Sequence, residues 1–292
     1  QLAKCFHPDV EMLTRTRGWQ KVKDMTMSDE IAAADWKNAE NAENVPLKWE
    51  KPLALTQRIG DLIHLANEGV SLRVTPDHRM VAFRSNNKAY ITTPLEISKA
   101  RTWANAGILG DCEDTLPRHN ELLLRLAVAT QADGSYKGAA PTESKLSRGK
   151  GLAIRFGFTR QRKIERFAAL VNQLPTGDWH RGISKQGATT FDIVGKSAAS
   201  IRSLLTSDKT FPNDWRKLSR IDRSIVLDEV QYWDGCVFGK AYSYCTTKKQ
   251  NAEVLQTIAA LSGRKTALRE KPRNNPKHAN VYSLTIRARA ST

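Results

Sequence analysis

Residues 121–135 read ELLLRLAVATQADGS, a run that is apolar on almost every side until its last turn. A surface helix carries a single apolar stripe, so a helix of this composition is expected to be buried between two packed halves. The small side chains of Ala127 and Ala129 would let a partner helix approach closely. Gly134 ends the run, as glycine commonly does, and leaves Asp133 at the tip of the helix.

The same ending recurs later in the chain. Residues 224–235 read SIVLDEVQYWDG, a second predicted helix that closes on Asp234 and Gly235, 101 residues after Asp133. Each acidic ending is followed by alternating strands and by a helix with apolar residues at helical spacing. The stretches are GLAIRFGFT (151–159), RQRKIERFAALVNQL (160–174), GKAYSYCTT (239–247), KKQNAEVLQTIAALSG (248–263) and VYSLTIRARA (281–290). The order predicts an α/β (α+β) domain of two pseudo-symmetric copies, the second of which stops before its last helix.

The positive charge of the chain is confined to the region that holds the two copies. Residues 1–116 contain 15 Lys and Arg against 16 Asp and Glu, whereas residues 117–292 contain 31 against 14. A basic domain joined to a neutral one favours a polyanionic partner, most often nucleic acid. No stretch has transmembrane length or the pattern of a membrane-surface helix, so no membrane partner is expected.

The cysteines are scattered, without a Cys-x-x-Cys pair, at Cys5, Cys112, Cys236 and Cys245. Neither a disulfide framework nor a zinc site is therefore expected. The pattern favours a reducing, cytoplasmic setting. The chain begins with Gln rather than Met, which favours a piece of a longer reading frame.

The first region shows short alternating strands and tight turns, an all-β pattern. It opens with CFHPDVEMLTRTRGWQKVKD at residue 5 and later contains VTPDHRMV, which includes Thr75 and His78. Cys5 followed by D-x-x-x-L-T and a Gly-Trp turn resembles the opening of an intein, or Hint domain, and T-P-D-H resembles the T-x-x-H motif of that family. The resemblance covers about residues 5–105.

The resemblance implies an N–S acyl shift. The Cys5 thiolate, a strong nucleophile, would attack the carbonyl of Lys4 and form a thioester. His78 would protonate the leaving amide nitrogen, since imidazole titrates near neutrality, and Thr75 would orient His78 or the scissile amide. Inteins end in His-Asn, but this chain ends in RARAST. Residues 1–116 are therefore expected to form a Hint-type all-β fold that is incomplete at its C-terminal side. Its expected partners are the flanking host-protein (extein) segments and, as one alternative, a separate C-terminal intein fragment.

LAVATQADGS (126–135) and VLDEVQYWDG (226–235) resemble the motif of the LAGLIDADG homing endonucleases, which often sit inside inteins. The resemblance covers about residues 117–290 and predicts repeats at 117–210 and 211–292. It implies that Asp133 and Asp234 each hold Mg²⁺ or Mn²⁺, which stabilises the attacking and leaving oxygens of phosphodiester cleavage. It also implies that Lys209, within KTFPNDW, is a catalytic cation that stabilises developing charge; no symmetric partner of Lys209 is identified.

The resemblance further implies that the outward faces of the strands form a saddle that lies in the major groove of double-stranded DNA. Expected DNA contacts, to bases or phosphates, are Arg155, Arg160, Arg162, Lys240, Lys248, Lys249, Arg287 and Arg289. The overall prediction is a monomeric, intein-encoded endonuclease that makes site-specific double-strand breaks. One alternative is a DNA-binding module that has lost cleavage, because Asp228 and Glu229 stand where the second motif usually has small or apolar residues. Another is part of a split or truncated intein whose main activity is thioester formation.

Overall fold

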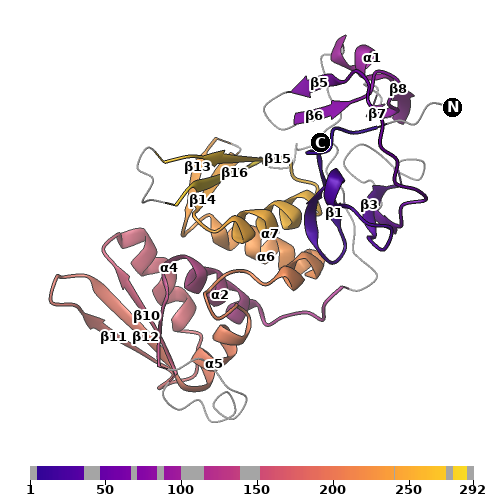
Figure 1. Cartoon of the computed structure of the whole chain (residues 1–292). Helices are drawn as coiled ribbons and strands as arrows, with labels where there is room; N and C mark the ends of the chain where they lie inside the picture. Colours follow the sequence, from indigo (N-terminus) through magenta and orange to yellow (C-terminus); the bar gives the residue numbers. More distant parts are fainter. Residues whose placement is uncertain are drawn as a thin grey trace. The chain divides into compact units, whose positions relative to one another are not determined.

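The computed structural model describes residues 5–35, 47–66, 71–83, 89–99, 115–138, 152–239, 241–273 and 279–287 (Figure 1). The chain divides into two compact units. Unit 1 comprises residues 1–115, 255–269 and 284–292, and unit 2 comprises residues 116–254 and 270–283. Within the described ranges, no helix combines the length and the apolar character needed to span a bilayer. Cys112, Lys240 and Arg289 lie outside the described residues.

The N-terminal part of unit 1 is built from short antiparallel strands. One sheet has the order β2-β1-β3-β4, and two hairpins pair β5 with β6 and β7 with β8. These elements are β1 (Glu11–Thr14), β2 (Gly18–Lys21), η1 (Val22–Asp24), β3 (Ile31–Ala34), β4 (Leu47–Glu50), β5 (Ile63–Ala66), β6 (Ser71–Val74), β7 (Met80–Phe83), β8 (Ala89–Thr92) and the helix α1 (Pro94–Lys99). A small apolar core joins the two hairpins and α1 through Leu65, Val74, Ala82 and Ile97. The short strands and turns agree with the all-β pattern predicted from the sequence. The helix α1 was not predicted. A Hint-type fold stays a prediction.

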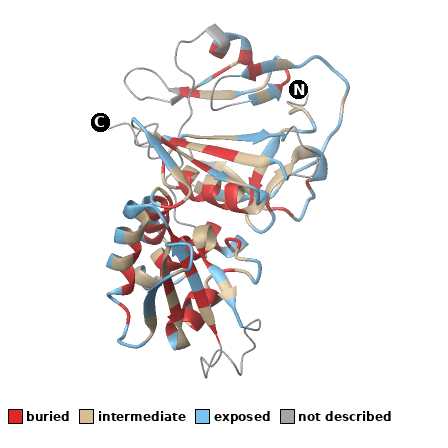
Figure 2. Cartoon of the chain, turned by 90° about the vertical axis from the view of Figure 1, so that its left-hand side faces the viewer, coloured by how far each residue is buried: buried red, intermediate tan, exposed pale blue. Residues whose placement is uncertain are grey.

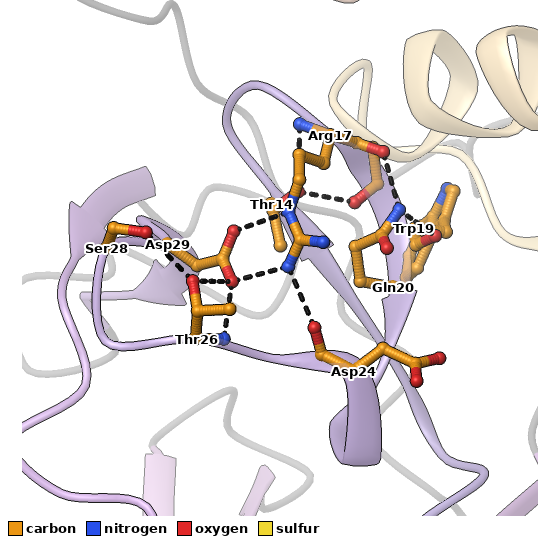
Figure 3. A network of polar contacts seen from close by, with 9 residues as sticks. Thr14, Arg17, Trp19, Gln20, Asp24, Thr26, Ser28 and Asp29 are labelled. Carbon is orange, nitrogen blue, oxygen red and sulfur yellow. Dashed lines mark hydrogen bonds and ion pairs between the residues drawn. The ribbon is translucent and has the colours of Figure 1, made fainter.

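A polar network fixes the turn between β1 and β2 to the loop before β3 (Figure 3). The Arg17 guanidinium binds the Asp29 carboxylate with two hydrogen bonds, including Nε to Oδ1 at 2.8 Å. Asp29 is only 4% exposed and also accepts hydrogen bonds from the backbone N and hydroxyl of Thr26. The bond from Arg17 is the main reason why the pKa of Asp29 is lowered to about 2.

The first copy contains the helix, strand and helix predicted over residues 121–174, together with strands at 135–137 and 179–183 that were not predicted. It contains α2 (Glu121–Asp133), β9 (Ser135–Lys137), β10 (Ala153–Phe158), α4 (Gln161–Val171), β11 (Trp179–Ile183), β12 (Thr189–Val194) and α5 (Gly195–Ser203). The antiparallel sheet has the order β11-β12-β10-β9. Along β10 the apolar side chains Ile154, Phe156 and Phe158 are buried and Arg155 is exposed, as predicted. Alternation of this kind is visible along strands in Figure 2.

The second copy repeats this order. It contains η3 (Asn213–Lys217), α6 (Arg220–Val230), β13 (Gly235–Phe238), β14 (Ala241–Thr246), α7 (Lys249–Ala260), β15 (Thr266–Lys271) and β16 (Val281–Arg287). Its sheet has the order β13-β14-β16-β15, which matches β9-β10-β12-β11 of the first copy strand for strand. The predicted repetition of helices and strands is therefore confirmed, and the structure adds that the strands pair in the same way in both copies. The short strands β9 and β13, which directly follow the two Asp-Gly pairs, were not predicted.

The second motif helix is shorter than predicted. It is α-helical only to Val230, and residues 231–234 form a turn before β13. Tyr232 N bonds to Glu229 O at 3.1 Å and Trp233 N to Val230 O at 3.3 Å, an i to i+3 pattern that winds this last turn more tightly. Burial of the Trp233 indole, whose Nε1 donates to Glu229 Oε1 at 2.9 Å, accompanies this tighter turn.

The motif glycines are needed for space rather than for a left-handed backbone. Gly134 has a φ of −75°, which any residue can adopt. A Cβ at Gly134 would lie 2.8 Å from Thr130 Cα, and one at Gly235 would lie 2.6 Å from Gln231 Cα. The chain therefore folds back closely over the end of each motif helix. Asp133 and Asp234, which directly precede these glycines, therefore lie at the tips of the two motif segments, where the chain turns back.

Candidate functional site

The two motif helices pack against each other within unit 2. α2 contacts α6, and Ala127 and Ala129 of α2 are fully buried, as their small side chains predicted. Each helix starts with a side-chain cap, since Asn120 accepts from Leu123 N and Ser219 accepts from Asp222 N. Helix packing and capping thus fix where the two helices end, and therefore where their acidic tips lie.

The carboxylates of Asp133 and Asp234 lie in one electrostatic environment. Burial raises the pKa of Asp234, and the negative charge of Asp133 raises it further, while Lys163 and Lys209 lower it. The structure thus places the two residues predicted as metal ligands close enough to interact electrostatically. It also places Lys209 beside them, because the Lys209 ammonium donates to the carbonyl oxygen of Gly134 at the end of α2.

The backbone of Lys209 is held in an uncommon conformation. Its φ of 63° is the only positive value at a non-glycine residue in the described part of the chain. The turn from Thr206 to Thr210 imposes it: Lys209 N donates to Thr206 O at 3.0 Å, and Thr206 N donates to Thr210 O at 3.0 Å. Asp208 accepts from both threonine hydroxyls and pairs with Lys248 Nζ at 3.1 Å. Strained residues of this kind cluster at functional sites, where the surrounding structure enforces them.

Lys163 is a site residue that the sequence analysis missed. It lies in the first turn of α4, and its Nζ is 2.6 Å from Asp133 Oδ2. One sequence signal was available: the stretch RQRK puts several positive charges at the start of a helix, where the helix dipole disfavours cations. A local rule that is broken in this way is often broken for function.

A cavity of about 370 Å³ opens beside Asp234. Its lining also includes Gln131, Asp208, Lys209, Lys248 and Arg273, so it carries three positive side chains beside the two carboxylates of Asp208 and Asp234. Beneath it the buried Tyr244 hydroxyl donates to Gln131 Oε1 at 3.0 Å. Burial raises the pKa of Tyr244, so the phenol stays protonated at neutral pH. The composition suits a group with negative charge, such as a phosphate.

The donors at the two tips fit a hard divalent cation. Carboxylate oxygens are the ligands that Mg²⁺ and Mn²⁺ prefer, and two half-buried carboxylates of like charge gain stability from a shared counter-charge. No group of three His, Cys, Asp or Glu side chains that could hold a metal occurs among the described residues. Mg²⁺ is usually held by one or two carboxylates together with waters and substrate phosphates, so this donor set is sufficient.

Several of the side chains predicted to contact DNA are bonded to other residues of this chain. Arg155 forms a two-point ion pair with Asp192, its partner across β10 and β12, at 2.7 and 2.9 Å. Arg162 donates to the backbone oxygen of Tyr232. Lys248 pairs with Asp208 and Lys249 with Glu253, whereas Arg160 and Arg287 are exposed at the start of α4 and the end of β16.

The predicted thioester residues also meet, in unit 1. Cys5 N donates to Thr75 Oγ1 at 3.2 Å, although the two residues are 70 positions apart. Thr75 N donates to Cys5 O and His78 N to Thr75 O, both at 3.0 Å. The imidazole of His78 packs edge-on against the ring of Phe6, with centroids 4.3 Å apart. The nitrogen that contacts Thr75 belongs to the Lys4–Cys5 peptide bond.

Comparisons with known proteins give distant similarities. No protein-family profile matches the chain. It is 23% identical to the ribonucleoside-diphosphate reductase subunit beta of Aquifex aeolicus (strain VF5), over 97% of this chain and 43% of that protein. It is 34% identical to the ATP-dependent Clp protease proteolytic subunit of Chlamydomonas moewusii, over 29% of this chain and 8% of that protein. The chain thus spans less than half the length of either relative.

Solved structures with a similar arrangement include variants of the homing endonuclease I-DmoI, at 13% identity and a TM-score of 0.41 over 57% of this chain and 88% of that one. They also include full-length DUF199/WhiA from Thermatoga maritima, at 10% identity and a TM-score of 0.36 over 59% of this chain and 53% of that one.

Proposed function

We propose that unit 2 carries the centre of a metal-dependent endonuclease that makes site-specific double-strand breaks in DNA. The observation that supports this most is the electrostatic interaction of Asp133 with Asp234 at the ends of two packed helices, with two lysines beside them. Two equivalent carboxylates related by a structural repeat suit a substrate that is itself two-stranded. The concentration of positive charge in residues 117–292 suits the same substrate.

The chemistry follows from the side chains at the site. Asp133 and Asp234 would hold Mg²⁺ or Mn²⁺, which when bound stabilises negative charge on phosphodiester oxygens. Lys209, aimed by its strained turn, would stabilise charge that develops on the phosphate being cleaved. The three cationic side chains of the adjacent cavity, Lys209, Lys248 and Arg273, would hold the DNA backbone in place.

The exposed face of each four-stranded sheet would provide sequence recognition. Arg155 projects from this face of β10, and its fixed two-point pairing with Asp192 holds the guanidinium plane in one orientation. A guanidinium fixed in this way can contact a guanine edge or a phosphate.

Selection on a randomised duplex library tests the proposal. Wild-type protein is incubated with the library in Mg²⁺ or Mn²⁺, and both strands of the recovered duplexes are examined for cuts. The expected result is cleavage of both strands at one sequence, lost in Asp133→Asn and Asp234→Asn and kept in the exposed control Asp214→Asn. Specific binding without any cutting by the wild type would instead support a DNA-binding module that has lost cleavage.

A second candidate function, formation of a thioester at Cys5, has its own supporting observation. The Thr75 hydroxyl lies within hydrogen-bond distance of the Cys5 amide nitrogen, the atom that must leave when the thiol attacks the preceding carbonyl. A host-protein segment would then precede Cys5, and this activity would belong to a longer, intein-type polypeptide.

A fusion of a reporter protein to the N-terminus tests this second function. Thiol or hydroxylamine should release the reporter from the wild-type fusion, and Cys5→Ala should abolish release. Thr75→Ala should slow release, whereas Thr93→Ala, in the turn before α1, should not. Equal release from the Cys5→Ala and wild-type fusions would rule out the thioester.

A further inference from the structure

Lys163 occupies an unusual place for a surface-helix lysine. Its side chain is 13% exposed, and its ammonium group lies 2.6 Å from Asp133 Oδ2. The same ammonium lies 6.0 Å from the centroid of the Trp233 ring, which directly precedes Asp234. Lys163 is therefore enclosed between the tips of the two motif helices.

The start of α4 is held against the end of α6 at an energetic cost. The first turn of α4 has no acidic residue, and Arg160 at its N-cap makes no side-chain capping bond. Positive side chains at this end oppose the helix dipole. Contacts beyond α4 offset this cost: Arg162 donates to Tyr232 O, and Arg166 pairs with the buried Glu229. These contacts fix the turn that carries Lys163.

In the second half of the site, the position that corresponds to Lys163 holds an uncharged residue. α7 begins at Lys249 as α4 begins at Gln161, so the third residue of α7, Asn251, corresponds to Lys163. Asn251 is uncharged and buried, and its Oδ1 accepts a hydrogen bond from Phe211 N at 2.8 Å. Among the described residues, Asp234 has no salt-bridge partner. A direct counter-charge thus covers the first carboxylate and not the second.

We propose that Lys163 is an internal counter-cation for the metal-free site, a role that rests on the proposed endonuclease function. Its ammonium group occupies the position at Asp133 Oδ2 that a divalent cation takes, and it moves aside when the cation binds. The reason is electrostatic: an ammonium group and a divalent cation on one carboxylate oxygen repel each other strongly at low dielectric. Lys163 therefore stabilises the protein without metal and weakens the binding of metal, and this makes the two halves of the site unequal.

A Mn²⁺ titration of the whole protein without DNA tests this role. Electron paramagnetic resonance measures the free ion at each step. Lys163→Met and Lys163→Gln should bind Mn²⁺ more tightly than wild type, by roughly 10-fold, the factor produced by about 1.4 kcal/mol. Both variants should melt at a lower temperature than wild type without metal, and the difference should shrink in saturating Mn²⁺. Lys163→Arg, which keeps the charge, and Lys196→Met, an exposed lysine of α5, should bind as wild type does.

Unchanged or weaker Mn²⁺ binding by Lys163→Gln would overturn the proposal, because Lys163 would then not compete with the cation. If Asp133→Asn and Asp234→Asn both bind Mn²⁺ as tightly as wild type, the metal site of the proposed function is instead overturned. The two failures are therefore distinguishable in one set of titrations.

Discussion

At the scale of single residues, the ionised form of Asp234 serves the proposed function but destabilises the folded protein. Burial and the neighbouring Asp133 raise its pKa, so the ionised form that the proposed function requires is disfavoured in the folded protein. A folded pKa above the unfolded one makes the protonated state the more stable, and stability falls as pH rises from the ordinary aspartate value through the raised one. Without metal, the ionised carboxylate of Asp234 therefore lowers the stability of the folded protein.

Asp234→Asn should consequently stabilise the metal-free protein at pH 7 while lowering cleavage by more than about 100-fold. Thermal melts between pH 4 and pH 8 check this, with the gap between variant and wild type narrowing as pH falls. Asp214→Asn, at an exposed position in η3, is the control. A variant that melts below wild type at pH 7 would contradict the assigned cause of the pKa shift.

Asp29 shows the opposite sign. Its folded pKa of about 2 lies below the ordinary 3.8, so the stability it provides is present above about pH 4 and is lost as pH falls toward 2. Because its partner Arg17 is 40% exposed and partly screened by water, Asp29→Asn should cost about 1–2 kcal/mol. Denaturant unfolding at pH 7 measures this cost, and Asp24→Asn, whose backbone oxygen alone joins the network, should cost much less. Equal losses in the two variants would contradict the network in Figure 3.

At the scale of elements, much of unit 2 could be predicted because its patterns are local. The apolar run at 121–133, the alternation of β10 and the repeated order of elements are each readable over a few residues. The strands β9 and β13 were not predicted because they are short and are stabilised by pairing with β10 and β14, which local patterns do not reveal. The early end of α6 depends on burial of Trp233, and the ion pair between Lys163 and Asp133 depends on tertiary packing that no local pattern contains.

Three helices of unit 2 are joined through one buried carboxylate. Glu229 of α6 is fully buried and pairs with Arg125 of α2 at 3.0 Å and with Arg166 of α4. Glu229→Ala would leave these two cations without their shared partner, and it should lower the free energy of unfolding by about 3 kcal/mol. Denaturant unfolding checks this value. Glu121→Gln removes the exposed carboxylate that Arg125 also contacts and should cost less than about 1 kcal/mol; similar costs for both variants would count against the buried network.

The cross-strand pair of β10 and β12 makes a prediction about DNA. Asp192→Asn should free the Arg155 guanidinium and tighten binding to unselected duplexes, because a carboxylate no longer competes with phosphate. Arg155→Met should weaken binding to all duplexes alike and lower the salt slope by about 1 if Arg155 contacts a phosphate. It should relax the sequence preference at one position if Arg155 contacts a base. Binding that neither substitution alters would place the DNA on another face.

At the scale of the whole molecule, the chain carries two sets of candidate site residues, one in each unit. Cys5 and Thr75 are hydrogen-bonded in unit 1, and Asp133 and Asp234 interact electrostatically in unit 2. Resemblance to known motifs marks the residues of both sets in the sequence. Their spatial proximity joins residues that lie 70 and 101 positions apart in the chain, and only the fold supplies it.

The most direct test of the central claim is a double-mutant cycle on Mn²⁺ affinity, with wild type, Asp133→Asn, Asp234→Asn and the double variant. Carboxylates that share one site act as a unit, so the double variant should lose little more affinity than either single variant. Losses that multiply in the double variant, or single variants that bind Mn²⁺ as tightly as wild type, would contradict the account.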